Sequence, residues 1–168
     1  MLNIIDNLKP FFEDCYGGIH VRKYSKINKI SPPTASKILS QYNKSGLLLV
    51  EKDRNYISYY ANKDSKDFID LSRIYWRNRL SGLIDYLNKS LLSPSAILFG
   101  SLAKAETKED SDIDLCILNN KKSIELNKFE KKLKRKIQLF FFRSIKDISN
   151  SELKNNIING YILSGRIK

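Results

Sequence analysis

The sequence predicts an α+β protein built from two small domains, residues 1–66 and 67–168. Two observations support this division. The first half combines helical periodicity, a capped helix start and a short hairpin pattern, whereas the second half contains two strands at residues 96–99 and 112–118. Residues 62–67 are polar and turn-like, as is typical of a domain boundary. A long helix expected at about residues 68–91 links the two parts.

Composition places the chain among ordinary globular proteins. Of 168 residues, 42% are hydrophobic and 29% charged, which excludes an intrinsically disordered chain. No apolar run is long enough to cross a bilayer, and the first residues lack the layout of a signal peptide. The only two cysteines, Cys15 and Cys116, are isolated and suit a reducing compartment. We therefore expect a cytoplasmic protein without a membrane partner.

The chain is strongly basic, with a net charge of +12. Residues 1–67 hold 11 basic and 7 acidic side chains, and residues 68–168 hold 19 and 11, so both halves are positive. Such a balance favours polyanionic partners, through Coulomb attraction and counterion release. A lysine-rich composition also serves solubility, and charge alone leaves both interpretations open.

The first domain is expected to contain three helices and a hairpin. Helical periodicity covers residues 2–14 and 19–27, and the pair Gly17-Gly18 separates the two segments. Ser31 followed by Pro32 is a favoured helix start, and the third helix should run through residue 44 and stop near Gly46. Residues 47–51 and 56–60 have the pattern of paired strands.

This succession resembles the winged helix-turn-helix fold, in particular its MarR-like form with Ser-Pro-Pro-Thr at residues 31–34 and Gly-Leu at residues 46–47. The resemblance implies that the third helix enters the DNA major groove and that the wing rests on the backbone. MarR-like modules recognise palindromes as dimers, so the analogy also implies a homodimer. The alternative is a winged helix used only for dimerisation or protein contact. The residues implied in base or phosphate contact are Thr34, Ser36, Lys37, Ser40 and Gln41, with Lys52 and Arg54 on phosphate.

The second domain carries the motif with the clearest chemistry. A short buried strand ends at Gly100-Ser101, and a second strand follows with Asp112 and Asp114 on one face. Two neighbouring carboxylates repel each other unless a cation neutralises them, and Mg²⁺ held by one or two carboxylates takes its other ligands from phosphates and water. Glycine allows close approach of a ligand to the backbone, and a helix start offers N–H groups to phosphate. The pattern predicts a site for a metal-bound triphosphate.

Phe99-Gly100-Ser101 followed by residues 111–115, Ser-Asp-Ile-Asp-Leu, resembles the signature of the DNA polymerase β-like nucleotidyltransferases, most closely their small MNT-type domains. The resemblance covers roughly residues 70–165 and implies a small mixed sheet flanked by helices. It also implies Mg²⁺ (or Mn²⁺) and a nucleoside triphosphate, with transfer of a nucleoside monophosphate to a hydroxyl on a protein or nucleic acid. Gly100, Ser101 and Lys104 would bind the nucleotide, and Asp112 and Asp114 would be catalytic and hold the metal.

Two departures from the family pattern open alternatives. The third strand, residues 137–142, lacks the third carboxylate of active members, and Gln138 is its expected replacement. An amide accepts hydrogen bonds but takes no proton near neutral pH. Ala105 also stands where the family has glycine. The alternatives to an enzyme are a DNA-bound regulator that senses nucleotide without turnover, and an antitoxin-like partner of another protein.

The remaining elements are a helix expected at residues 121–136, the third strand, and a last helix at about residues 151–159. Six basic residues crowd the end of the first of these helices, more than helix capping requires, and leave a contact with RNA, DNA or an acidic protein open. Trp76 with Arg77 and Arg79 suggests either nucleic-acid stacking or a core aromatic residue flanked by arginines, and the second reading is favoured. The six basic residues are Lys128, Lys131, Lys132, Lys134, Arg135 and Lys136.

Overall fold

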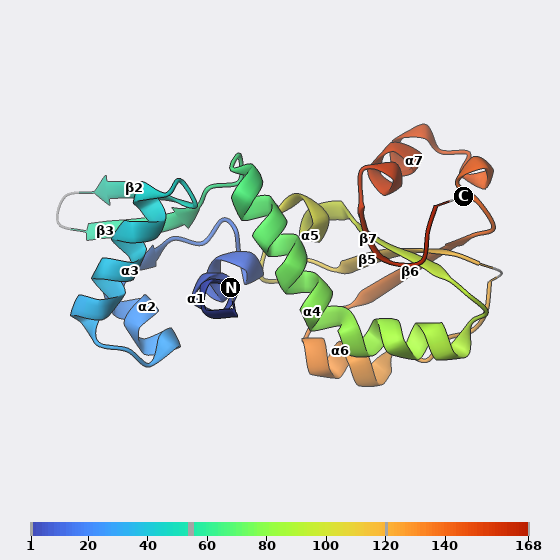
Figure 1. The fold of residues 1–168 in the computed structure, drawn as a ribbon, viewed down its shortest axis with the longest axis horizontal. Coiled ribbons are helices and arrows are strands. Elements are labelled where there is room, and N and C mark those ends of the chain that lie inside the picture. Colours follow the sequence, from blue (N-terminus) through green and yellow to red (C-terminus); the bar gives the residue numbers. More distant parts are fainter. Residues whose placement is uncertain (1, 54–55, 120, 168) are drawn as a thin grey trace. The chain divides into compact units, whose positions relative to one another are not determined.

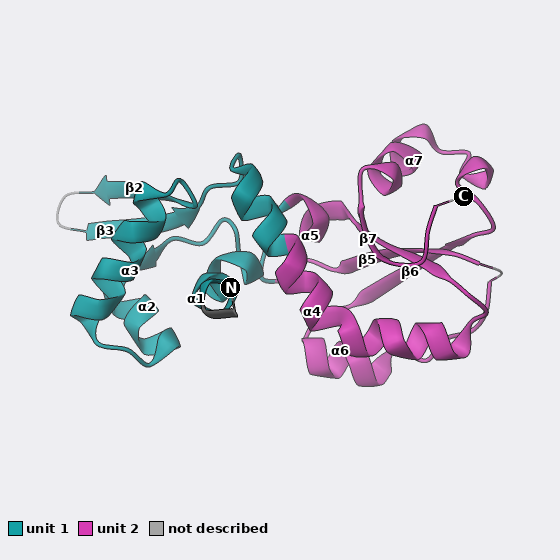
Figure 2. Ribbon diagram, viewed as in Figure 1, with its two compact units in different colours: residues 1–72, 105–109 teal, residues 73–104, 110–168 magenta. Residues whose placement is uncertain are grey.

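The computed structural model describes residues 2–53, 56–119 and 121–167, and the chain folds as two compact units (Figure 2). Unit 1 comprises residues 1–72 and 105–109, and unit 2 comprises residues 73–104 and 110–168. The long helix α4 (Lys66–Ser90) begins in unit 1 and continues into unit 2. Within the described residues, no helix is long and apolar enough to cross a membrane.

In the residues that the structure describes, unit 1 contains α1, α2, α3, the start of α4 and a small antiparallel sheet of strand order β1-β3-β2 (Figure 1). Its core is formed by buried side chains that include Leu8, Phe11, Tyr24, Leu39 and Leu48. The elements follow the order α1 (Leu2–Glu13), β1 (Ile19–His20), α2 (Val21–Asn28), α3 (Pro32–Lys44), β2 (Leu48–Asp53) and β3 (Tyr56–Ala61).

Helix α3 begins as its sequence predicts. The Ser31 hydroxyl accepts a hydrogen bond from the Thr34 N–H, and prolines follow at the first helical positions. The chain leaves the helix through Gly46, whose φ of 75° lies in the left-handed region that glycine adopts readily. Because these signals are local, the bounds of α3 could be predicted without tertiary information.

The segment expected as one helix at residues 19–27 is divided in the structure. Ile19 and His20 form β1, which pairs with Tyr59 and Ser58 of β3. The helix begins only at Val21, because His20 has extended backbone angles and its Nδ1 accepts a hydrogen bond from the Lys23 N–H. His20 therefore serves as the N-cap of α2.

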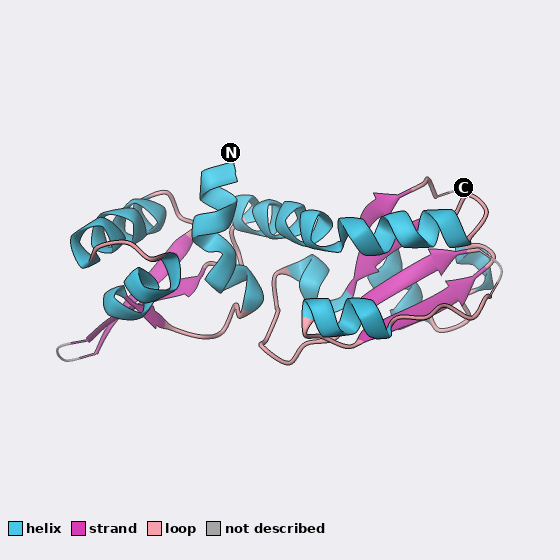
Figure 3. Ribbon diagram, turned by 90° about the horizontal axis from the view of Figure 1, so that it is seen from below, coloured by secondary structure: helices cyan, strands magenta, loops and turns pink. Residues whose placement is uncertain are grey.

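Unit 2 is built on a four-stranded mixed sheet of order β6-β5-β4-β7. Strand β4 pairs antiparallel with β5 and β7, and β5 pairs parallel with β6. Helices α4 and α6 cover one face of this sheet and α7 covers the other (Figure 3). Its elements after α4 are β4 (Ser95–Phe99), α5 (Gly100–Lys104), β5 (Ile113–Leu118), α6 (Asn127–Leu133), β6 (Ile137–Phe142), the 3-10 helix η1 (Ile145–Asp147), α7 (Ser151–Ile158) and β7 (Tyr161–Ser164).

The core of unit 2 lies on both faces of β4 and β5. All five residues of β4 are buried, as is typical of a central strand. On the α7 side, Ile97, Phe99 and Cys116 pack with Ile148 and Ile157. Trp76 on α4 is fully buried. It is therefore a core residue, and its ring is not available for stacking on nucleic acid. Cys15 and Cys116 are buried free thiols, and burial raises their pKa to about 11 and about 12.

The α+β class is confirmed, with two differences from the expected elements of unit 2. The helix expected at residues 121–136 spans only Asn127–Leu133. The preceding segment is tied to the end of α4, since Asn119 Nδ2 donates to the Leu92 carbonyl and Lys122 Nζ to that of Ser90. At its other end, Lys134 has a left-handed φ of 57° and terminates the helix. Strand β7 was not expected.

Candidate active site

The centre of the site is the junction where β4 ends beside the start of β5. Phe99 pairs with Asp114 in the antiparallel register, so the next residue, Gly100, lies against the Asp114 side chain. Gly100 has a φ of 70°, and a Cβ at this position would collide with Oδ2 of Asp114. Both the backbone conformation and the contact therefore require glycine.

Gln138 lies beside the two carboxylates. It pairs with Asp114 in the parallel register of β5 and β6, and its Nε2 donates a hydrogen bond of 2.7 Å to Oδ2 of Asp112. Asp112 and Asp114 are partly exposed, and Gln138 is exposed. That Gln138 takes the place of a third carboxylate stays a prediction.

The electrostatics of the pair are unfavourable in the absence of a cation. Burial raises the pKa of Asp114 above its usual value of 3.8, and the neighbouring negative charge of Asp112 raises it further. The Gln138 amide offsets part of this repulsion by donating to Asp112. A carboxylate pair whose charge the protein only partly compensates is suited to binding a cation.

Two hydrogen bonds to residues 135 and 136 hold the segment that carries Asp112. Arg135 Nη1 donates to the Ser111 carbonyl at 2.7 Å, and the Ile113 N–H donates to the Lys136 carbonyl at 2.9 Å. Arg135 is only 8% exposed, and its guanidinium lies 5.3 Å from the centre of the Trp76 ring. The place of Arg135 in the lysine run had suggested an exposed basic surface. Arg135 is instead buried, and it positions the segment that carries Asp112.

The other predicted nucleotide-binding residues lie on α5, which starts at Gly100. Ser101 is partly exposed in the first turn of this helix. Lys104, the last residue of α5, is exposed, and its Nζ donates a hydrogen bond of 2.8 Å to Oδ1 of Asn156 on α7. Ala105 follows with a left-handed φ of 56° and is fully buried. The family's glycine at this position would adopt that conformation without strain, whereas alanine adopts it at an energetic cost.

The donor set fits a divalent cation. Asp114 lies against Gly100 and interacts with the charge of Asp112, and Mg²⁺ takes oxygen ligands of this kind while keeping positions for phosphate and water. Within the described residues there is no cluster of three or more His, Cys, Asp or Glu side chains that could hold a metal by themselves.

In unit 1, the residues predicted to contact DNA are mostly exposed. Thr34, Ser36, Lys37 and Gln41 are exposed on α3, opposite the buried Ala35, Leu39 and Tyr42, and Ser40 is partly buried. Lys52 is exposed on β2. Arg54, assigned to the hairpin turn, lies outside the described residues. Whether these side chains bind DNA stays a prediction.

Sequence comparison bears on the second half of the chain. The family model described as "Polymerase beta, Nucleotidyltransferase" matches residues 82–166, which include β4, α5, β5 and the strand that carries Gln138. No curated protein shows a significant match to the chain.

Proposed function

The chain belongs to the polymerase beta nucleotidyltransferase family, and we propose that unit 2 transfers a nucleoside monophosphate from a nucleoside triphosphate to an acceptor hydroxyl. The observation that carries this proposal is that Gly100 lies against Asp114, whose carboxylate interacts with the charge of Asp112. Both halves of the sequence motif thereby contribute to a single site, with the acidic pair beside a backbone position that has no side chain.

In this proposal, Asp112 and Asp114 hold Mg²⁺ or Mn²⁺ together with the triphosphate. The cation would neutralise negative charge on the phosphates and so favour attack at the α-phosphorus. The Ser101 hydroxyl and the first backbone N–H groups of α5 would donate to the phosphates. Lys104 would add a positive charge if it exchanged its Asn156 contact for phosphate.

The reaction forms a bond between the acceptor oxygen and the α-phosphorus and breaks the bond from that phosphorus to the bridging oxygen of pyrophosphate, which leaves. The acceptor hydroxyl loses its proton in the process. Gln138 cannot take this proton, since a neutral amide is not a base near neutral pH. The proton would therefore pass to water, and we expect transfer to be slow compared with a site that has a third carboxylate.

The direct test is incubation of the full chain with each α-labelled nucleoside triphosphate and Mg²⁺ or Mn²⁺, alone and with cell extract. The control is the double variant Asp112→Asn with Asp114→Asn, which preserves the shape of both side chains and removes their charge. Label transferred by the wild-type chain and not by the variant would establish the activity, and the labelled molecule would identify the acceptor as protein or nucleic acid.

Two negative outcomes lead to the other functions. Metal-dependent nucleotide binding without transfer would indicate a nucleotide sensor, for which the absence of a base at Gln138 is the structural reason. Neither binding nor transfer would leave unit 2 as a scaffold for a partner protein, as in an antitoxin-like role.

A second function is favoured for unit 1, which we propose is a winged helix that binds duplex DNA. The supporting observation is the element order α1-β1-α2-α3-β2-β3 with sheet order β1-β3-β2, in which α3 exposes polar side chains and β2 pairs antiparallel with β3. A helix of this kind fits the major groove. Selection of bound fragments from a random duplex library would test it, and enrichment of a palindrome would support a dimeric reader.

A further inference from the structure

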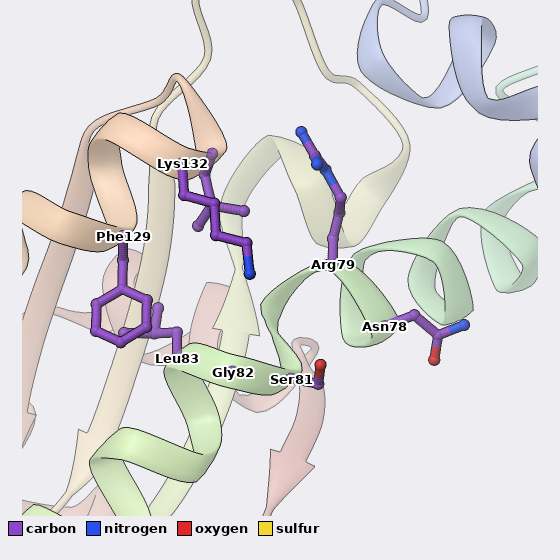
Figure 4. Close-up of a pocket in the computed structure, with 8 residues that line it drawn as sticks. Asn78, Arg79, Ser81, Gly82, Leu83, Phe129 and Lys132 are labelled. Carbon is purple, nitrogen blue, oxygen red and sulfur yellow. The ribbon is translucent and has the colours of Figure 1, made fainter.

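A pocket separate from the acidic pair opens between α4 and α6 in unit 2 (Figure 4). Its volume is about 240 Å³, enough for a small ligand or for one unit of a polymer. The nucleotidyl transfer proposed above makes no use of it. Residues from α4 and α6 line it: Asn78, Arg79, Ser81, Gly82, Leu83, Phe129, Lys132 and Leu133.

The floor of the pocket is formed at Gly82, in the middle of the long helix α4. Glycine inside a helix costs about 1 kcal/mol relative to alanine. Packing within the chain does not explain this glycine, because a Cβ at Gly82 would have no atom within 4 Å. The absence of a side chain here instead leaves the helix backbone open to whatever enters the pocket.

The rim of the pocket is positively charged. Arg79 on α4 and Lys132 on α6 both contribute to the lining, and none of the eight lining residues is acidic. Figure 4 shows the Lys132 side chain extending from α6 toward α4 near Ser81 and Gly82. Outside the pocket, the exposed lysines of α6 and the turn after it continue the charge: Lys128, Lys131, Lys134 and Lys136.

One wall is an aromatic ring. Phe129 is partly exposed and packs its ring against Tyr86, with the ring centres 5.2 Å apart, so the phenyl group is held in place while remaining accessible. Bases stack on exposed aromatic rings with little sequence preference. Trp76, the aromatic residue that the sequence offered for stacking, is fully buried and unavailable.

We propose that this pocket binds one nucleotide of a single-stranded nucleic acid, with the base against Phe129 and its phosphate beside Lys132. A free nucleotide would need only Lys132 for its phosphate. The additional exposed lysines favour a chain whose neighbouring phosphates continue along α6. The site is distinct from the acidic pair and requires no metal.

The test measures fluorescence anisotropy of a labelled oligothymidylate of about twelve nucleotides, long enough to span the pocket and its flanking lysines. The full chain is titrated in EDTA, so that metal-dependent nucleotide binding at Asp112 and Asp114 does not contribute. Gly82→Leu is the main variant, because it fills the floor of the pocket while improving helix propensity. Lys132→Ala removes a rim charge, and Lys146→Ala, an exposed lysine on η1, is its charge-matched control.

We expect Gly82→Leu and Lys132→Ala each to weaken binding about tenfold. Lys132→Ala should also make binding less dependent on salt. Lys146→Ala should bind like wild type. Thermal unfolding of Gly82→Leu at or above the wild-type temperature would exclude misfolding as the cause.

Three results would overturn the proposal: no binding at low salt, equal losses in Lys132→Ala and Lys146→Ala, or full binding by Gly82→Leu. If thymidine monophosphate displaces the oligonucleotide at equal nucleotide concentration, the pocket binds single nucleotides. That result would contradict binding of a single-stranded nucleic acid. Because these measurements exclude metal and triphosphate, they remain informative if nucleotidyl transfer is absent.

Discussion

The side-chain amide of Gln138 donates a 2.7 Å hydrogen bond to the Asp112 carboxylate. An amide at this point satisfies one acceptor of the acidic pair without adding charge. The site can therefore exist without a bound cation at a lower electrostatic cost than three neighbouring carboxylates would impose.

Replacing the Gln138 amide by a carboxylate should turn its attraction to Asp112 into repulsion. Gln138→Glu keeps the length of the side chain but converts the hydrogen bond into a like-charge contact with Asp112. We expect the metal-free variant to lose about 1 kcal/mol of stability, a modest figure because Gln138 is exposed. Saturating Mg²⁺ or Mn²⁺ should restore the stability of the variant. Thermal unfolding with and without the cation measures this effect.

The same substitution tests the proposed chemistry. Label transfer should rise above the wild-type level in Gln138→Glu or Gln138→Asp if the missing base is what limits the reaction. Gln138→Ala, which removes the hydrogen bond without adding a base, is the control and should show no gain in label transfer. Equal behaviour of Gln138→Ala and Gln138→Glu would rule out a role for the added carboxylate.

A pH dependence follows from Asp114. Its pKa is raised by burial and by Asp112 above 3.8, so the folded protein holds this proton more tightly than the unfolded chain. The stabilisation from this group is fully present below pH 3.8 and is lost as the pH rises through the raised pKa. Asp114→Asn removes the titration, so in EDTA it should be more stable than wild type at neutral pH, with the difference shrinking under acid conditions.

Urea unfolding at several pH values measures this difference. A variant that is equally or less stable than wild type at neutral pH without metal would contradict it. Added Mg²⁺ should reverse the order, because wild type keeps both carboxylates and Asp114→Asn keeps one.

Gly100 and Gly82 form a natural pair for testing why each glycine is present. Gly100→Ala places a Cβ against the Asp114 carboxylate and forces alanine to a φ of 70°, so we expect a loss of about 2 kcal/mol and of label transfer. Gly82→Ala is made in open space within a helix and should gain about 1 kcal/mol. Thermal unfolding of both variants checks the opposite signs.

The sequence was sufficient to predict the acidic site because its determinants are local. A buried strand ending in Gly-Ser and an alternating Asp-Ile-Asp each specify a short element, and antiparallel pairing of Phe99 with Asp114 brings them together. Gln138 could be anticipated because it is the second residue of a short apolar strand. The hydrogen bond from its amide depends on the parallel register of two strands and could not be read from either strand alone.

Arg135 shows where sequence reasoning is limited. In the sequence it is one of six cations near the expected end of a helix, with nothing to distinguish it from its neighbours. Only the left-handed turn at Lys134 directs the chain so that Arg135 is buried against Trp76 and reaches the Ser111 carbonyl. Likewise, the pocket over Gly82 depends on the packing of α6 against α4, which composition does not encode in a recognisable motif.

The last prediction concerns unit 1 and the exposed side of α3. Lys37 is exposed on this helix, and in the proposed winged helix it would contact a phosphate or a base of duplex DNA. Lys37→Ala should weaken binding to a selected duplex about tenfold and reduce the dependence on salt by about one phosphate contact. Lys9→Ala, an exposed lysine on α1, removes the same charge elsewhere on unit 1 and should leave binding unchanged. Equal losses in the two variants would mean that net charge, and not α3, attracts the DNA.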